Sequence, residues 1–204
     1  GSVRDALLGR LGNDLDFTTP ARPEVVKEIL DEWAETVWDT GIDFGTVSAA
    51  YKGQQIEITT FRSDSYDGQS RNPEVVYGDT LEGDLVRRDF KANAMAIELL
   101  ADASFKFHDP LHGLQDIADR VLDTPDKPEI SFHDDPLRML RAARFASQLE
   151  FRVADRVVEA MRDMAGEIQR ITVERVQVEL DKLICGTAPW DGIDLLVSTG
   201  IADY

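Results

Sequence analysis

Acidic residues with a spacing that suits metal binding stand at two places in the sequence. Asp14 and Asp16 are separated by one residue, in a stretch where polar and apolar residues alternate as they do in a β-strand. Successive strand side chains point to opposite faces, so both carboxylates should lie on one face. Glu57 lies in a second alternating stretch, on the face opposite Ile56 and Ile58. If the two strands are neighbours, three carboxylates converge and need a cation, because clustered anions repel one another.

The chemistry that such a cluster predicts is displacement at phosphorus. Divalent cations such as Mg²⁺ prefer oxygen ligands, and a pair of them promotes in-line attack on a phosphate. Taken alone, an Asp-x-Asp pair is more often a solvated strand face. However, a turn with Gly1 and Ser2 and a short helix with Arg4 precede the pair, and free N–H groups at a helix start bind phosphate. This order favours nucleotidyl transfer.

A first arginine-rich stretch could bind a nucleotide. Arg88 could hold a triphosphate, while Asp89 and Asn93 could form hydrogen bonds with sugar hydroxyl groups. The alternative is a surface arginine pair beside a run of core residues.

A second arginine-rich stretch follows Pro136, a residue that favours a helix start. Arg138, Arg141 and Arg144 recur every third residue, so they fall within about 120° around that helix. The alternative is a solvated basic face balanced by acids one turn away. Apolar residues share the same side, and arginines among apolar groups favour an anionic or planar partner, both of which a nucleotide supplies.

These residues depend on elements that the sequence pattern predicts. Strands are expected at 14–18, 45–51 and 54–61, with a hairpin turn at Gly53. A long polar loop is expected at 62–83, and irregular structure or a strand at 98–107. Helices are expected at 3–8, 23–38, 84–97, 113–120, 136–149, 153–168, 172–185 and 189–198. Mixed α/β structure followed by helices predicts an α+β fold of two units, with a boundary near 108–135.

The composition indicates a folded protein, because 43% of the 204 residues are hydrophobic and 30% are charged, which excludes a disordered chain. No apolar run approaches the roughly 20 residues that a membrane-spanning helix needs, so no membrane partner is expected. The single cysteine, Cys185, cannot form an internal disulfide, which favours a reducing cytoplasm and a cytoplasmic protein. The net charge of −17 argues against nucleic-acid binding, although the local distribution of arginines matters more than the sum.

Six motifs in order make the chain resemble the class II tRNA nucleotidyltransferases, the CCA-adding enzymes. These share a superfamily with bacterial poly(A) polymerases and have a head related to polymerase β. The first three motifs are the phosphate turn with the acidic pair at 1–16, the strand with the third acid at 56–62 and the sugar-binding motif at 87–95. The other three are the hinge at 109–122, the base-selecting motif at 134–145 and the end of the neck at 170–175. The resemblance implies an α+β fold with a nucleotidyltransferase head at 1–112, containing a mixed sheet with helices. An all-α neck would follow at 113–186 and the start of a helical body at 187–204.

The resemblance also implies a role for each candidate residue. Asp14 and Asp16 would hold two Mg²⁺ ions, with Glu57 as the third catalytic acid. Asp135 and Arg138 would act as an amino-acid template for the base of C or A. The remaining nucleotide-binding residues would be Gly1 and Arg4 at the triphosphate, Arg88 at the nucleotide, Asp89 and Asn93 near the ribose, and Arg141 and Arg144 at the base or phosphates.

The implied activity is transfer of CMP and AMP from CTP and ATP to the 3′ end of tRNA. Lys91 and Asp134 depart from the family pattern, which usually has Thr and Glu there. The first strand and one motif glycine are expected to be missing, and basic RNA-binding surface is expected beyond residue 204. The alternatives are a poly(A) polymerase, a CC-only or A-only enzyme, and a non-catalytic RNA-binding or nucleotide-sensing module. The oligomeric state stays open.

Overall fold

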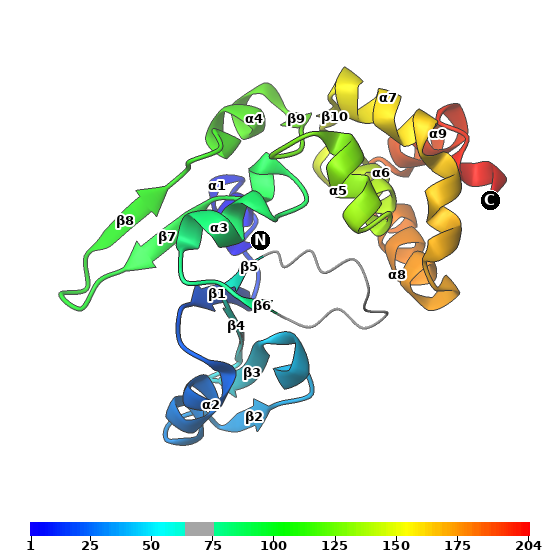
Figure 1. Ribbon diagram of the computed structural model, residues 1–204. Coiled ribbons are helices and arrows are strands. Elements are labelled where there is room, and N and C mark those ends of the chain that lie inside the picture. Colours follow the sequence, from blue (N-terminus) through cyan, green and yellow to red (C-terminus); the bar gives the residue numbers. More distant parts are fainter. Residues whose placement is uncertain (64–75) are drawn as a thin grey trace. The chain divides into compact units, whose positions relative to one another are not determined.

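The fold comes from a computed structural model that describes residues 1–63 and 76–204. Part of the polar loop expected over 62–83 lies outside the described residues, and so does the side chain of Asp14. The described chain divides into two compact units, and Figure 1 shows the elements of each. The first unit takes residues 1–87 and 95–110, and the second takes 88–94 and 111–204. The expected α+β class is confirmed, while the boundaries of head, neck and body stay predictions.

The first unit is built on a four-stranded mixed sheet in the order β1–β4–β3–β2. Its strands are β1 (Asp14–Thr19), β2 (Thr36–Trp38), β3 (Thr46–Tyr51) and β4 (Gln54–Thr60). β1 runs parallel to β4, whereas the other two pairs are antiparallel. Lys52 and Gly53 join β3 to β4 with φ angles of 49° and 76°, which is the left-handed region that glycine enters without steric cost. The hairpin expected at Gly53 is confirmed.

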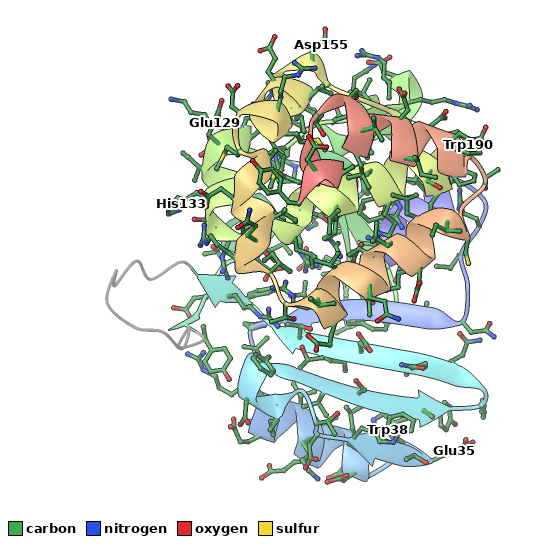
Figure 2. The ribbon with its side chains drawn as sticks, turned by 90° about the vertical axis from the view of Figure 1, so that its right-hand side faces the viewer. Glu35, Trp38, Glu129, His133, Asp155 and Trp190 are labelled. Carbon is green, nitrogen blue, oxygen red and sulfur yellow. The ribbon has the colours of Figure 1, made fainter. Side chains whose placement is uncertain are left out.

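Helix α2 (Pro23–Asp31) covers one face of this sheet, as Figures 1 and 2 show. Val26 and Leu30 of the helix pack on Val47 and Ala49 of β3, and all four side chains are buried. The helix expected over 23–38 is too long, because Val37 pairs with Ala49 as part of β2. Val37 continues the apolar spacing of the helix, but its pairing with β3 makes it part of a strand.

The remaining elements of the first unit are short. They are α1 (Ser2–Leu7), η1 (Ile42–Phe44), β5 (Arg62–Ser63), β6 (Val76–Tyr77), α3 (Leu81–Val86), β7 (Ala96–Leu99) and β8 (Phe105–His108). β5 pairs with β6 and β7 with β8, both antiparallel. The helix expected over 84–97 is wrong, because the chain becomes extended at Phe90 (φ −134°, ψ 148°), whose ring is fully buried in the second unit.

The second unit is mostly helical. Its elements are η2 (Lys91–Asn93), α4 (Gly113–Asp119), β9 (Val121–Leu122), α5 (Pro128–Asp134), α6 (Leu137–Leu149), β10 (Arg152–Val153), α7 (Asp155–Asp163), η3 (Ala165–Arg170), α8 (Val173–Ile184), α9 (Pro189–Ser198) and η4 (Ile201–Asp203). Helix α6 packs against both α8 and α9, and most of its residues are buried. The helix expected over 153–168 divides into α7 and η3, and α5 was not expected. In the described ranges, no helix is both long and apolar enough to cross a lipid bilayer.

Candidate active site

The two acidic strands of the first unit lie side by side on the polar face of the sheet. Ala49 faces α2, and its partner on β4 is Ile56, so the next residue, Glu57, points to the opposite face. Asp16 is the register partner of Glu57 on the parallel strand β1. Partner positions in neighbouring strands share a face, and both carboxylates are exposed. The sequence prediction that these acids come from adjacent strands is therefore met for Asp16 and Glu57.

The donor set of this face suits a hard divalent cation. Asp14 precedes Asp16 by two positions and pairs with Gln55 through the backbone, while its side chain lies outside the described part of the chain. Among the described side chains, no three from His, Cys, Asp and Glu form a group that could hold a metal ion. Asp16 and Glu57 supply exposed carboxylate oxygens on strands about 4.8 Å apart, and such oxygens are the ligands that Mg²⁺ prefers. Convergence of all three carboxylates stays a prediction.

The start of α1 lies beside the acidic face. The backbone N–H of Asp16 donates to Ser2 Oγ at 2.8 Å. A Cβ atom placed on Gly1 would be 4.0 Å from Asp16 Oδ2, so this turn adjoins the carboxylate. Arg4 is buried, and its guanidinium donates to both carboxylate oxygens of Asp5 at 2.9 and 2.8 Å. The structure thus brings Gly1 and Ser2 to Asp16, and it gives Arg4 a carboxylate partner.

Asp89 is a buried carboxylate of the second unit, and both of its oxygens have partners. Oδ2 accepts from Arg141 Nε at 2.7 Å and lies 2.6 Å from Arg141 Nη2. Oδ1 accepts from the Phe90 N–H at 2.9 Å and from Asn93 Nδ2 at 2.8 Å. Burial acts to raise the pKa of Asp89, but the Arg141 charge and these hydrogen bonds hold it below its usual range. Asp89 and Arg141 therefore form an ion pair that the neutral Asn93 amide joins by a hydrogen bond. Arg88 is half-buried in the same segment.

The arginines of α6 also contact a second carboxylate, that of Glu179 in helix α8. Glu179 is buried, and its Oε2 lies 2.9 Å from Arg144 Nε as an ion pair without the alignment of a hydrogen bond. Glu179 Oε1 lies 3.7 Å from Arg141 Nη1. The Arg144 guanidinium also lies 4.0 Å from the ring centroid of Phe145, within the range of a cation–π contact. Two of the three predicted arginines of α6 are thus held by carboxylates from the protein itself.

Asp135 and Arg138, the predicted base-reading pair, lie at the start of α6. Asp135 Oδ1 accepts from the Leu137 N–H at 3.2 Å, and its Oδ2 accepts from Arg175 Nη2 at 2.9 Å. Arg138 Nη1 donates to Ser131 Oγ at 2.8 Å. Both members of the pair are half-buried.

Lys91, one of the two departures from the family pattern, has a defined place in the second unit. Its Nζ lies 2.6 Å from Asp123 Oδ2, and the Asp123 carboxylate also accepts from Arg156 Nε at 2.7 Å. Lys91 N–H donates to the Asp123 carbonyl at 2.9 Å. The lysine therefore anchors residues 88–94 to the chain after β9. Asp134, the other departure, is the exposed last residue of α5.

Sequence reasoning missed two polar residues that organise these groups, Ser131 and Glu179, each of which contacts a predicted site residue. It placed Ser2 in the turn before the acidic pair but gave it no role, and Ser2 contacts Asp16. A signal existed for Glu179, because it lies four residues after Arg175 in α8, and residues four apart share a helix face. No local pattern marks Ser131, since its contact depends on how α5 meets α6.

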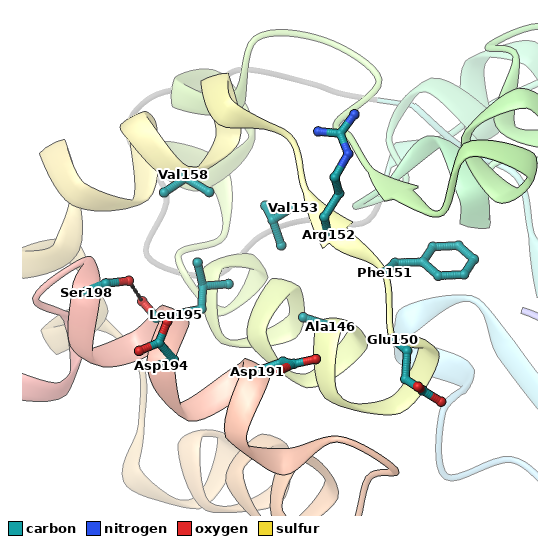
Figure 3. A pocket seen from close by; sticks show the side chains of 10 residues that line it. All are labelled: Ala146, Glu150, Phe151, Arg152, Val153, Val158, Asp191, Asp194, Leu195 and Ser198. Carbon is teal, nitrogen blue, oxygen red and sulfur yellow. Dashed lines mark hydrogen bonds between the residues drawn. The ribbon is translucent and has the colours of Figure 1, made fainter.

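A surface hollow of about 390 Å³ lies elsewhere in the second unit, between the end of α6, β10, α7 and α9 (Figure 3). Apolar side chains such as Val153 and Leu195 line it together with Arg152, Asp191 and Asp194. It contains none of the predicted site residues, so the candidate active site is not at this hollow.

The chain matches two protein families along most of its length. Residues 1–123 match the family of poly A polymerase head domains, and residues 150–204 match a family described as the probable RNA and SrmB-binding site of polymerase A. The CCA-adding enzymes of Listeria innocua and Levilactobacillus brevis are 41% and 42% identical to it over 205 residues. Each alignment covers all of this chain and 50% of the relative, so the chain spans about half the length of these curated relatives.

Solved structures resemble the chain as well. The crystal structure of the Bacillus stearothermophilus CCA-adding enzyme in complex with CTP matches 98% of this chain and 47% of that chain, with a TM-score of 0.86 and 37% identity. A tRNA nucleotidyltransferase complexed with a primer tRNA and an incoming ATP analog matches all of this chain and 56% of that chain, with a TM-score of 0.82 and 27% identity.

Proposed function

We propose that this chain, which belongs to the family of poly A polymerase head domains, is the catalytic part of a CCA-adding tRNA nucleotidyltransferase. The reaction is transfer of CMP and AMP from CTP and ATP to the 3′ end of tRNA. The observation that carries this proposal is the register pairing of Asp16 with Glu57 beside Gly1 and Ser2. The identity with CCA-adding enzymes over the whole chain supports it. A reducing cytoplasm suits the proposal, because Cys185 has no second cysteine to pair with.

Asp14, Asp16 and Glu57 would hold two Mg²⁺ ions in this reaction. Such ions lower the pKa of the attacking 3′-hydroxyl and stabilise the pyrophosphate that leaves. The contribution of the chain is to place carboxylates on adjacent strands, whose backbone the sheet holds in register. The Ser2 hydroxyl accepts a hydrogen bond from the Asp16 N–H, and this bond would join the phosphate-binding turn to the acidic strand.

The nucleotide itself would be bound by residues from several elements. Gly1 and Arg4 would contact the triphosphate and Arg88 the nucleotide, with Asp89 and Asn93 near the ribose. Arg141 and Arg144 would lie near the base or the phosphates. The pairing of Arg141 with Asp89 and of Arg144 with Glu179 supports a preformed group, since the arginines are already oriented.

Base selection would rest on Asp135 and Arg138. A carboxylate accepts from the amino group that C and A share, and a guanidinium donates to their ring nitrogen. U and G present the opposite pattern, so they would leave polar groups of the protein unpaired. Unpaired groups of this kind allow rejection by about 10⁴-fold.

The proposal is tested with the protein over its full natural length, Mg²⁺ and a tRNA that lacks its last three nucleotides. Labelled CTP and ATP are supplied separately and together. Growth by three nucleotides only with both substrates is the expected result. A long ladder with ATP alone would identify a poly(A) polymerase instead, and growth limited to C or to A would identify a partial enzyme. No incorporation by the folded, metal-loaded protein would overturn the proposal in favour of a nucleotide-sensing module.

The acidic face gives a sharper prediction. Asp16→Ala should lower kcat by about 10³-fold or more, because the metal-holding carboxylate contributes several kcal/mol to the transition state. The matched control is Asp43→Ala, which removes an exposed carboxylate of the same unit outside the acidic face. Circular dichroism should show that both variants fold. Turnover by Asp16→Ala at the control level would contradict the role of this strand.

A further inference from the structure

Ser131 contacts both residues of the base-reading pair. Its hydroxyl accepts from Arg138 Nη1 at 2.8 Å, and its carbonyl accepts from the Asp135 N–H at 3.2 Å. The Asp135 carbonyl in turn accepts from the Arg138 N–H at 3.0 Å. One residue of α5 therefore fixes the backbone of Asp135 and the side chain of Arg138 at once.

The place of Ser131 makes it a rigid support. It lies inside α5 with only 7% of its surface exposed, and its neighbour Phe132 is fully buried. A serine has one side-chain torsion to fix, whereas arginine loses about 2 kcal/mol of rotamer freedom when it is immobilised. A bond from the short, buried side chain to the long, half-buried one therefore restricts the orientation of the guanidinium.

The chemistry of the acceptor matters as much as its position. A serine hydroxyl is neutral, so it orients the Arg138 guanidinium without cancelling its charge. It engages Nη1, and a guanidinium has five N–H donors in a fixed planar arrangement. Holding one edge of that plane sets the direction in which the other donors point.

We propose that Ser131 is a positioning residue for base discrimination, because it holds Arg138 in the orientation that reads the ring nitrogen of C or A. This inference rests on the proposed function and adds to it a residue outside the base-reading pair. Hydrogen bonds to a base select only when the donor direction is fixed. A guanidinium without this restraint would also meet the exocyclic carbonyl oxygens of U and G, so selection would weaken.

The test compares Ser131→Ala and Ser131→Thr with the unchanged protein over its full natural length. The matched control is Ser198→Ala, because Ser198 lies in α9 of the same unit and its exposed hydroxyl bonds only within its own helix, to the Leu195 carbonyl among the bonds described. For each protein, kcat/KM is measured with CTP and UTP on a tRNA that awaits C, and with ATP and GTP on a tRNA that awaits A. Thermal unfolding is followed in parallel.

Ser131→Ala should lower kcat/KM for CTP and ATP by about 3- to 10-fold, the range that the net contribution of one typical hydrogen bond supplies. The values for UTP and GTP should stay equal or rise, so the discrimination ratio falls. Ser131→Thr keeps the hydroxyl and should restore the ratio, while Ser198→Ala should leave it unchanged. A purely structural role would lower all four values together and would lower the melting temperature.

The outcomes separate the two proposals. If the unchanged protein adds neither C nor A, the proposed function fails. If it adds both and Ser131→Ala keeps the discrimination ratio of the unchanged protein, only the role of Ser131 fails. A uniform fall with all four nucleotides, not restored by Ser131→Thr, would also overturn that role.

Discussion

At the scale of single residues, Asp89 shows how the protein keeps a charge inside its core. A buried carboxylate ordinarily gains a proton, because burial disfavours the charged form. Here the Arg141 charge, the Asn93 amide and the Phe90 N–H outweigh burial, and the pKa of Asp89 falls below its usual range. The ion pair therefore joins residues 88–94 to α6, and the same carboxylate holds the Asn93 side chain in place.

Asp89→Asn should lower the free energy of unfolding at pH 7 by about 3 kcal/mol, because it leaves Arg141 without its nearest counter-charge. A carboxyl group whose pKa is lower in the folded than in the unfolded protein stabilises the fold at any pH above its unfolded pKa, which is about 3.9 for aspartate. This stabilisation disappears as the pH falls through the lower pKa of the folded state. The deficit of the variant should thus be constant from pH 5 to 7 and shrink below about pH 4.

Urea unfolding at several pH values measures this deficit. Asp163→Asn, which changes an exposed aspartate of α7, is the control and should stay within about 0.5 kcal/mol of the unchanged protein. A deficit at Asp89→Asn that grows as the pH falls would contradict the lowered pKa.

The same scale shows what the sequence can and cannot predict about the site. Strand alternation predicted the outward face of each acid, but the common face of Asp16 and Glu57 also needs β1 and β4 to be neighbours, which the residue spacing left open. The partner Ser131 comes from a contact between α5 and α6 that no local spacing encodes. The roles of the individual site residues stay predictions. Asp16, Glu57 and the arginines of α6 lie on the expected kind of element, whereas Arg88 and Asp89 do not lie in the helix that was expected over 84–97.

At the scale of elements, helices α6 and α9 approach each other closely at Gly192. A Cβ atom on Gly192 would lie 2.6 Å from the Ala143 carbonyl oxygen and 2.9 Å from Leu183 Cγ. Real Cβ atoms do not approach a backbone oxygen that closely, so only glycine fits without moving a helix. This contact keeps α6, which carries Arg138, Arg141 and Arg144, packed against α9.

Gly192→Ala should destabilise the protein by about 1–3 kcal/mol, the usual cost of overpacking, although alanine normally favours a helix. Gly12→Ala is the matched control, because nothing lies within 4 Å of the added carbon there and the residue is exposed. Thermal unfolding of both variants measures the effect. Equal melting temperatures would show that α9 can shift away from α6 without loss.

Two elements show why the sequence pattern failed in part. Val37 continues the apolar spacing of α2 but pairs in β2, since hydrogen bonding to β3 outweighs helix periodicity. Phe90 was expected inside a helix, yet its backbone is extended, because this conformation lets its ring pack edge-to-face on the Phe145 ring with 5.8 Å between the ring centroids. The hairpin at Gly53 and helices α6, α8 and α9 were predicted correctly, because turn chemistry and strong periodicity are local.

At the scale of the whole molecule, the charge balance constrains RNA binding. The chain has 39 acidic and 22 basic residues, and several arginines already pair with carboxylates, among them Arg141, Arg144, Arg156 and Arg175. Neutralised arginines release few counterions when they approach phosphate. We infer that this chain supplies little of the electrostatic attraction for a long RNA.

This inference predicts a weak dependence of RNA affinity on salt. Each phosphate contact on single-stranded RNA adds about −0.7 to the slope of log K against log salt concentration. Residues 1–204, produced alone, should bind tRNA with a slope no steeper than about −3, measured by fluorescence anisotropy between 50 and 300 mM KCl. A short oligolysine of known charge calibrates the slope. A value of about −6 or steeper would mean that this acidic chain concentrates its cations on one RNA-binding surface, and the explanation from neutralised arginines would then be wrong.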